Sequence, residues 1–299
     1  MNRGHFYACL AYTLWGLLPI YWQRLSSVPA TQVVAHRIVW SCLVLVPIVL
    51  VSGQWSAIRA ALSDRRVVAR QLLASVLVCA NWLGFVWAVT HDRMIESSLG
   101  YYINPLMSIL LAVSFLGEHL RKAQKLAVLV ATLGVIWLTV QYGSVPWIAL
   151  GLAVTFCLYG LAKKTTKLHP IASLSIETWA LFLPAVGFLA FEHLAGRGRW
   201  LAGDRVGDLM LVGAGVATTI PLLLFAAGTQ LIPLSTTGIL QYIGPTLQFI
   251  LGAFVYQEPF DAGKLMGFGL VWLALVIYAS DSLFGQRPPL PSSIELDQT

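Results

Sequence analysis

The chain has 299 residues, of which 58% are hydrophobic and only 11% are charged. A typical soluble protein has about 25% charged residues, so this composition and a mean hydropathy of +0.75 exclude a soluble enzyme. The formal net charge is +6, but the basic residues stand singly in short loops, which argues against a nucleic-acid partner. The four cysteines show neither CxxC nor Cys/His spacing, so we expect no metal site, no cofactor and no disulfide framework.

Ten apolar stretches follow one another along the chain, each long enough to cross a bilayer, which takes about 20 helical residues. The first stretch begins after Arg3 but lacks an A-x-A cleavage site, so we favour a retained helix over a removable signal peptide. We therefore predict an all-α polytopic membrane protein with ten transmembrane helices and a polar, disordered tail at 285–299. The predicted spans are residues 5–23, 32–52, 69–90, 96–116, 122–141, 145–162, 171–191, 207–229, 235–256 and 263–283.

Lysine and arginine residues are concentrated in alternate loops. If the N-terminus is cytoplasmic, the inner segments hold twelve of them and the outer segments hold six, while Arg37 lies within a span. Because positively charged loops stay on the cytoplasmic side of a membrane, we predict that both termini and the tail are cytoplasmic. The inner set is Arg3, Arg59, Arg65, Arg66, Arg70, Arg121, Lys122, Lys125, Lys163, Lys164, Lys167 and Arg287.

The sequence repeats itself after 140 residues. This shift places Ser97–Pro105 on Thr237–Pro245 and Glu118 on Glu258. Each half holds five spans, and because five is odd, the two halves enter the membrane in opposite directions. Secondary transporters with such inverted repeats bind substrate near the bilayer midplane, between the repeats, so the repeat predicts transport. The predicted five-helix units are residues 1–142 and 143–284.

Each unit ends its fourth predicted helix with the spacing Pro-x12-Glu. This pattern resembles the EamA-type drug/metabolite transporters, and several longer strings are similar to the RarD branch of that family. The resemblance implies ten helices, alternating access, efflux and a bacterial inner membrane, and it marks Glu118 and Glu258 as signature residues without naming a solute. The strings are Ala35–Ser41, Asn81–Leu83, Trp87–Val89, Ser98–Leu106, Ile176–Thr178 and Gln241–Leu247.

Arg37 and Glu177 are the two charged residues that we place well inside spans. An ionisable group in hydrocarbon costs at least about 2.5–3.5 kcal/mol on insertion scales, so such residues normally face a bundle interior or an aqueous cavity. The 140-residue shift places Arg37 on Glu177, whereas aligning Pro29 with Pro170 places His36 there instead. We expect a basic group and Glu177 to meet near the repeat axis, as a counter-ion pair, a substrate clamp or a proton site at Glu177. The alternative is that both side chains snorkel to the nearer membrane face.

The fourth helix of each unit carries a polar stripe. Leaving such groups in lipid would waste hydrogen bonds, so we expect both stripes to line a cavity; the alternative is hydrogen bonding between helices. The stripe residues lie on one helix face and are Ser97, Tyr101, Asn104 and Ser108, with the repeat image Thr237, Gln241, Gly244 and Gln248.

Aromatic residues accompany this set. Trp40, Asn81 and Trp82 could form a wall that stacks flat or cationic substrates, whereas most tryptophans of a membrane protein, Trp22 and Trp200 among them, mark interfacial belts. The predicted substrate-binding or coupling residues are Arg37, Glu177, His36, Trp40, Asn81, Trp82, Tyr101, Asn104, Gln241 and Tyr242.

Prolines and acids mark the ends of the two polar helices. Pro105 and Pro245 each remove a helical hydrogen bond, which would either kink the helix as a gate or serve packing alone. We expect Glu118 to cap or pair at its own helix end, beside Arg121, and Glu258 to do the same as a structural charge.

These features together predict a secondary transporter that moves a small organic solute, amphiphilic or aromatic, by rocking of the two units. The alternatives are a channel, a non-transporting membrane partner subunit or an intramembrane enzyme. A channel would show rings of charge or a carbonyl filter, and the six histidines are too scattered for catalysis. The spacing Gly263-x3-Gly267 leaves open a homodimer or packing within one chain, and Glu177 leaves open proton coupling.

Overall fold

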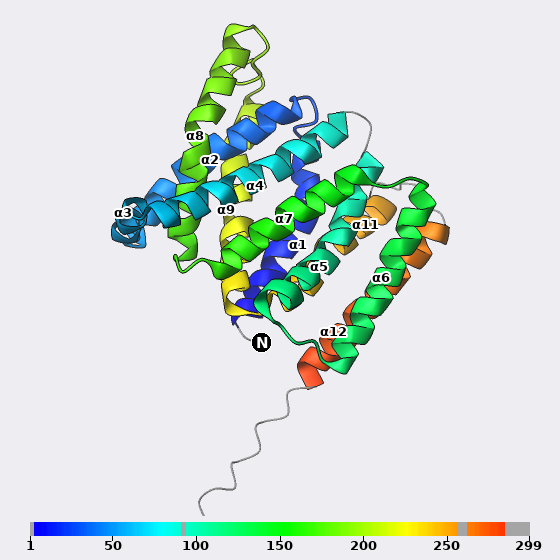
Figure 1. Cartoon of the computed structure of the whole chain (residues 1–299). Helices are drawn as coiled ribbons and strands as arrows, with labels where there is room; N and C mark the ends of the chain where they lie inside the picture. The colour runs from blue at the N-terminus through cyan, green and yellow to red at the C-terminus, as the bar shows by residue number, and fades with distance from the viewer. Residues whose placement is uncertain (1–2, 91–93, 256–261, 285–299) are drawn as a thin grey trace, which may run out of the picture.

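Figure 1 shows the computed structural model of the chain, which describes residues 3–90, 94–255 and 262–284. Within these ranges the chain forms helices and no strand, so the all-α prediction is confirmed there. The predicted tail at 285–299 and Glu258 lie outside the described residues. The elements are α1 (Arg3–Gln23), α2 (Ala30–Val51), α3 (Trp55–Ser63), α4 (Arg65–Thr90), α5 (Met94–Leu116), α6 (Lys122–Tyr142), α7 (Trp147–Thr165), α8 (Pro170–Leu194), α9 (Arg205–Leu231), α10 (Leu234–Leu240), α11 (Ile243–Ile250), the π-helical η1 (Leu251–Val255) and α12 (Ala262–Phe284).

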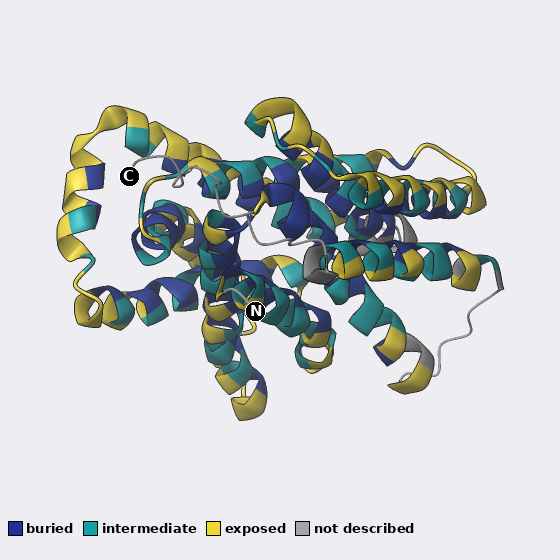
Figure 2. Ribbon diagram, turned by 90° about the horizontal axis from the view of Figure 1, so that it is seen from below, coloured by how far each residue is buried: buried dark blue, intermediate teal, exposed yellow. Residues whose placement is uncertain are grey.

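Seven of the described helices, α2 and α4 to α9, contain a stretch that is long and apolar enough to cross a membrane. Figure 2 shows exposed residues around the outside of the bundle and buried residues where the helices face one another. Large apolar side chains point outward, such as Leu183 and Val140, which are 76% and 69% exposed. A surface of this kind fits contact with lipid and a multi-pass membrane protein. That α1, the stretch from α10 to η1, and α12 also cross the membrane, which would give ten spans, stays a prediction.

The prediction of one continuous helix at 235–256 is wrong. This stretch forms α10, α11 and η1, with a break at Gln241 and Tyr242. Pro245 has no N–H to donate to the Gln241 carbonyl four residues earlier, and Gly244 N donates to that carbonyl in a tighter turn, at 3.1 Å. Pro105, in contrast, lies within the uninterrupted α5.

The short helix α3 lies between α2 and α4 and was not predicted from the hydropathy pattern. It buries Ile58 and Ala61 against a cluster that includes Ala172 and Ile176 of α8. The opposite side of α3 faces outward, since Trp55 is 44% exposed. This arrangement places an amphipathic helix at one end of the bundle.

Helix pairs from distant parts of the sequence build the bundle. Helix α2 packs against α8 and α9, α4 against α7 and α8, α5 against α7 and α10, and α1 against α9 and α11. Helices α6 and α12 pair with each other, and Figure 1 shows this pair at one edge. The interior where α2, α4, α7, α8 and α9 meet is therefore the place to look for a site.

The α6–α12 contact depends on close backbone approach. A Cβ added to Gly267 would lie 2.5 Å from Leu138 Cγ, and one added to Gly134 would lie 3.0 Å from the Gly267 carbonyl oxygen. Trp137 Nε1 donates to the Gly263 carbonyl at 2.9 Å. The spacing Gly263-x3-Gly267 thus serves packing within one chain, and its use between two chains would compete with this contact.

The two glycines of α12 give a matched test of this packing. We expect Gly267→Ala to lower the free energy of unfolding by about 1–3 kcal/mol, because the added methyl group overpacks the contact with Leu138. Gly269 has open space at its Cβ position, so Gly269→Ala should be neutral or stabilising by up to about 1 kcal/mol through helix propensity. Thermal unfolding in detergent measures both, and equal midpoints for the two variants would contradict the close approach.

Candidate functional site

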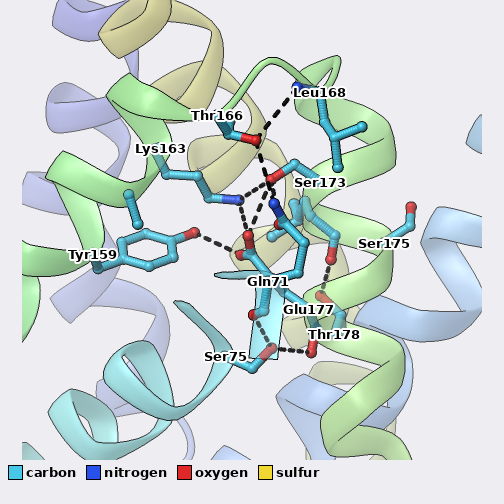
Figure 3. A network of polar contacts seen from close by, with 12 residues as sticks. Gln71, Ser75, Tyr159, Lys163, Thr166, Leu168, Ser173, Ser175, Glu177 and Thr178 are labelled. Atoms are coloured by element: carbon cyan, nitrogen blue, oxygen red, sulfur yellow. Dashed lines mark hydrogen bonds and ion pairs between the residues drawn. The ribbon is translucent and has the colours of Figure 1, made fainter. Parts of the chain in front are cut away.

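A buried ion pair joins α7 to α8. Lys163 Nζ lies 2.5 Å from Glu177 Oε1, and the two side chains are 1% and 2% exposed. Figure 3 shows both groups pointing toward each other inside a polar network. Removing two charges from water is costly unless their remaining hydrogen-bonding capacity is also satisfied, so the neighbours of the pair decide whether it is stable.

Hydrogen bonds from three helices surround the pair. Lys163 Nζ also donates to Ser173 Oγ at 2.9 Å, and Ser173 Oγ lies 2.8 Å from Gln71 Oε1 and 3.0 Å from Glu177 Oε1. The Tyr159 hydroxyl donates to the second carboxylate oxygen, Glu177 Oε2, at 3.3 Å. Both oxygens of Glu177 are therefore contacted, and α4, α7 and α8 are tied together by one network.

Local sequence explains how the pair forms. Helix α7 continues to Thr165, so Lys163 lies in its last turn, where the helix dipole favours a cation. Helix α8 begins at Pro170, and Ser173 and Glu177, four residues apart, share one helix face. The predicted end of the span at 145–162 is wrong, because Lys163 belongs to the helix and not to the loop after it. That this end of the helix faces the cytoplasm stays a prediction. Ser173-x3-Glu177 after a nearby lysine is the sequence signal that was missed.

Arg37 has a different environment. Its guanidinium carbon lies 4.6 Å from the centroid of the Trp82 ring and 5.0 Å from that of Trp22. Its Nε donates to Thr218 Oγ1 at 2.9 Å. Within the described residues no ion pair joins Arg37 to a carboxylate. Trp22 was expected in an interfacial belt, but here it contacts the cation.

Arg37 is therefore not the counter-ion of Glu177. Cys42 of α2 donates to the Thr178 carbonyl of α8, so Glu177 lies near the level of Cys42. Arg37 precedes Cys42 by five residues, which is roughly 8 Å along a helix. Arg37 therefore lies at a different level from Glu177, whereas Lys163 reaches it.

A small cavity lies between these two charged regions. It is lined by Trp82 and Thr218, which contact Arg37, and by Tyr159 and Glu177 of the ion-pair network. Its volume is about 10 Å³, room for roughly one water molecule. The other lining residues are Ile38, Ser41, Val78, Leu174, Thr178, Leu181, Thr219 and Leu222. The helices must move apart before a solute could occupy this place.

Two of the predicted residues, Asn81 and Tyr242, form hydrogen bonds between packed segments of the bundle. Asn81 Nδ2 donates to the Leu152 carbonyl at 2.8 Å and to Thr155 Oγ1 at 3.1 Å, which joins α4 to α7. The Tyr242 hydroxyl donates to the Tyr102 carbonyl at 3.1 Å. These contacts agree with the alternative prediction, in which polar residues hydrogen-bond between helices instead of lining a cavity.

The polar stripe of α5 meets α7 at Cys157. Ser108 Oγ lies 3.2 Å from Cys157 Sγ, which also donates to the backbone carbonyl of Asn104. Asn104 Oδ1 is buried without a partner among the described residues. Tyr101 packs beside Phe85, with ring centroids 6.1 Å apart. The side chain of Ser97 lies outside the described residues.

The remaining predicted residues lie farther from the ion pair. His36 and Trp40 both pack against Trp200, with ring centroids 5.4 and 5.3 Å apart. Trp200, which the sequence predicts in an interfacial belt, is thus in contact with two of the predicted site residues. Gln241 is buried in the break between α10 and α11.

Glu118 caps α10 rather than its own helix end, which corrects the prediction. Its carboxylate accepts hydrogen bonds from Leu234 N at 2.7 Å, Ser235 N at 3.1 Å and Ser235 Oγ at 2.6 Å. Gly117 follows α5 with a φ of 65°, a conformation that glycine adopts without strain, and it turns the chain toward α10. A carboxylate at a helix N-terminus satisfies free amide groups and the helix dipole.

The sequence profile of the EamA-like transporter family matches residues 2–140 and again residues 144–280. The chain belongs to the EamA-like transporter family. It is 42% identical to the uncharacterized transporter YojE of Bacillus subtilis over 96% of each chain. It is also 38% identical to protein RarD of Escherichia coli, over 96% of this chain and 97% of that one. These relatives place it in the RarD branch of the family.

One more distant relative and one solved structure are also similar to this chain. The chloramphenicol-sensitive protein RarD of Pseudomonas aeruginosa is 28% identical over 94% of this chain and 95% of that one. A protein of known crystal structure superposes with a TM-score of 0.70 at 19% identity, covering 92% of this chain and 96% of that one. At this identity the likeness concerns the fold alone.

The buried pair of this EamA-like protein can be tested by a double-mutant cycle. Lys163→Met and Glu177→Leu should each lower the free energy of unfolding by about 3–5 kcal/mol, because each leaves one buried charge without its partner. The double variant should be more stable than either single variant, since it removes both charges.

Thermal unfolding midpoints in detergent measure the cycle. Arg197→Met is a suitable control, because Arg197 pairs with Glu192 at 2.7 Å on the exposed surface, and surface pairs contribute little. Additive losses in the double variant would contradict the direct coupling of Lys163 and Glu177.

Proposed function

We propose that this protein is a secondary transporter that exports a small organic solute across the bacterial inner membrane by alternating access. The observation that carries the proposal is a buried ionic network beside an interior cavity, built from residues of both halves of the chain. Gln71 and Trp82 come from the first half, whereas Lys163, Glu177 and Thr218 come from the second. A solute at this place would contact both halves.

The proposed architecture is two five-helix units of opposite orientation, residues 1–142 and 143–284, with both termini in the cytoplasm. The two stretches matched by the family profile support these boundaries. The packing also supports them. In the proposed exchange of the units, α1, α2, α4, α5 and α6 correspond to α7, α8, α9, α10–α11 and α12. The contact between α1 and α9 then corresponds to that between α7 and α4, and the contact between α2 and α9 corresponds to that between α8 and α4. Likewise, the contact between α5 and α7 corresponds to that between α11 and α1. The pairs α2–α8 and α6–α12 each join two corresponding helices, so the exchange leaves them unchanged.

Alternating access fits this packing better than a fixed pore does. Rocking of the units would act on contacts that cross between them, such as Ser75 Oγ to the Glu177 carbonyl and Ser41 Oγ to the Gly215 carbonyl. The cavity is closed to anything larger than about one water molecule, whereas a pore needs a continuous path. The names of several relatives, which call them transporters, agree with a carrier.

Reconstitution into proteoliposomes tests the proposal. A carrier binds solute on one side at a time, so unlabelled solute on the far side should accelerate the movement of labelled solute, and the rate should saturate. Labelled chloramphenicol and benzoate are suitable first probes within a broader panel of small metabolites. Protein-free liposomes are the control. Non-saturating flux without acceleration would indicate a channel, and the absence of flux for the whole panel would support a non-transporting subunit.

We also propose that Glu177 takes up a proton when rocking separates it from Lys163, and that this step couples export to the proton gradient. Lys163→Met with Glu177→Gln removes the proton site without leaving either member of the ion pair as an unpartnered charge. Exchange by this double variant, whatever its rate, should no longer rise when a pH gradient is applied, whereas wild-type exchange should. A gradient response equal to that of the wild type would remove Glu177 from the coupling step.

A further inference from the structure

Arg37 is a half-buried cation whose hydrogen-bonding capacity is largely unused within the protein. A guanidinium group carries five N–H donors, and among the described residues only Nε has an acceptor, Thr218 Oγ1 at 2.9 Å. The Trp22 and Trp82 rings at 5.0 and 4.6 Å stabilise the charge but accept none of the remaining donors. A planar, bidentate acceptor such as a carboxylate matches those donors.

The charges around the cavity do not balance. Its surroundings hold two cations, Arg37 and Lys163, and one carboxylate, Glu177, among the described residues. Lys163 and Glu177 neutralise each other at 2.5 Å, so the positive charge of Arg37 is not balanced by a carboxylate. An unbalanced charge at membrane depth is costly, and a ligand with a single negative charge would offset it. A neutral or cationic ligand would not offset the charge of Arg37.

A second unused group lies on the cavity wall. Thr219 Oγ1 is fully buried and has no hydrogen-bond partner among the described residues, and Thr219 lines the cavity next to Thr218. A buried hydroxyl without a partner costs free energy that a ligand acceptor would recover. Apart from Thr218 and Thr219, the lining consists of five aliphatic residues, the Trp82 ring and four polar residues. These four, Ser41, Tyr159, Glu177 and Thr178, already form hydrogen bonds within the protein, so the site offers little to a second polar group on the ligand.

We propose that the transported solute is a small monoanionic carboxylate with a flat, apolar body, whose carboxylate is held by Arg37 and the Thr219 hydroxyl while its body packs beside Trp82. This inference rests on the proposed transport function and adds the class of solute. The carboxylate adds the missing negative charge, and the body displaces water from the aliphatic lining. Binding requires the helices to separate, since the closed cavity is too small.

Three aromatic probes of similar size that differ in charge test the inference. Purified full-length protein in detergent is titrated with benzoate, benzamide or benzylammonium at constant ionic strength, and the thermal unfolding midpoint is followed, because a ligand that binds the folded state raises it. We expect benzoate alone to raise the midpoint in a saturable manner. Arg37→Gln should increase the half-saturating benzoate concentration by about 10- to 100-fold, the effect of losing a hydrogen bond to a charged group.

The chain offers a matched control. Arg59 also lies over a tryptophan ring, at 5.5 Å from the Trp55 centroid, but it is exposed on α3 and is not one of the residues that line the cavity. Arg59→Gln should leave the benzoate response unchanged. If Arg37→Gln does not fold, Arg37→Lys keeps the charge without the planar donor pair and should retain the preference for benzoate at reduced affinity.

The inference is overturned if benzamide or benzylammonium stabilises the protein as well as benzoate does, if Arg37→Gln responds to benzoate like the wild type, or if none of the probes shifts the midpoint. These outcomes are separate from failure of the transport proposal. Accelerated exchange of a neutral solute that benzoate does not inhibit would reject the anionic class and retain transport. Absence of exchange for every solute, with benzoate still bound through Arg37, would reject transport and retain the anion site.

Discussion

The free energy of placing charge in the interior decides how α4, α7 and α8 are arranged. A buried ion pair is tolerated only when its remaining donors and acceptors are satisfied. Lys163 and Glu177 meet this condition because Ser173 and Tyr159 contact them directly, while Gln71 of a third helix contacts Ser173. Any motion that opens this part of the bundle must either separate the charges or move the network as one body. The pair therefore controls which helices can move relative to one another.

The charges of Arg37 and Glu177 are stabilised in different ways. Glu177 has a cation at 2.5 Å, whereas Arg37 has two aromatic rings and one hydroxyl group. Aromatic rings stabilise a cation without neutralising it. Residues that contact Arg37 and residues of the ion-pair network line the same small cavity, so the proposed anion would meet one free cation and one neutralised pair.

Some of this site could be predicted from the sequence. A charge within a long apolar stretch indicates an interior position, and both Arg37 and Glu177 lie inside the bundle. Their partners could not be predicted in the same way. Lys163 stands at the end of a span and resembles a loop lysine, and Trp22 resembles a belt residue. Glu118 stands beside basic residues in the sequence but caps α10, which is 116 residues away.

Composition and periodicity by themselves determined the all-helical membrane class, the repeat and the family resemblance, because these depend on the spacing of apolar residues and on local motifs that hold wherever the helices finally lie. Only the tertiary structure decided which charge meets which, because the relative height and rotation of packed helices depend on side-chain packing over their whole length. A shift of one helical turn, about 5.4 Å, would have given Glu177 a different partner.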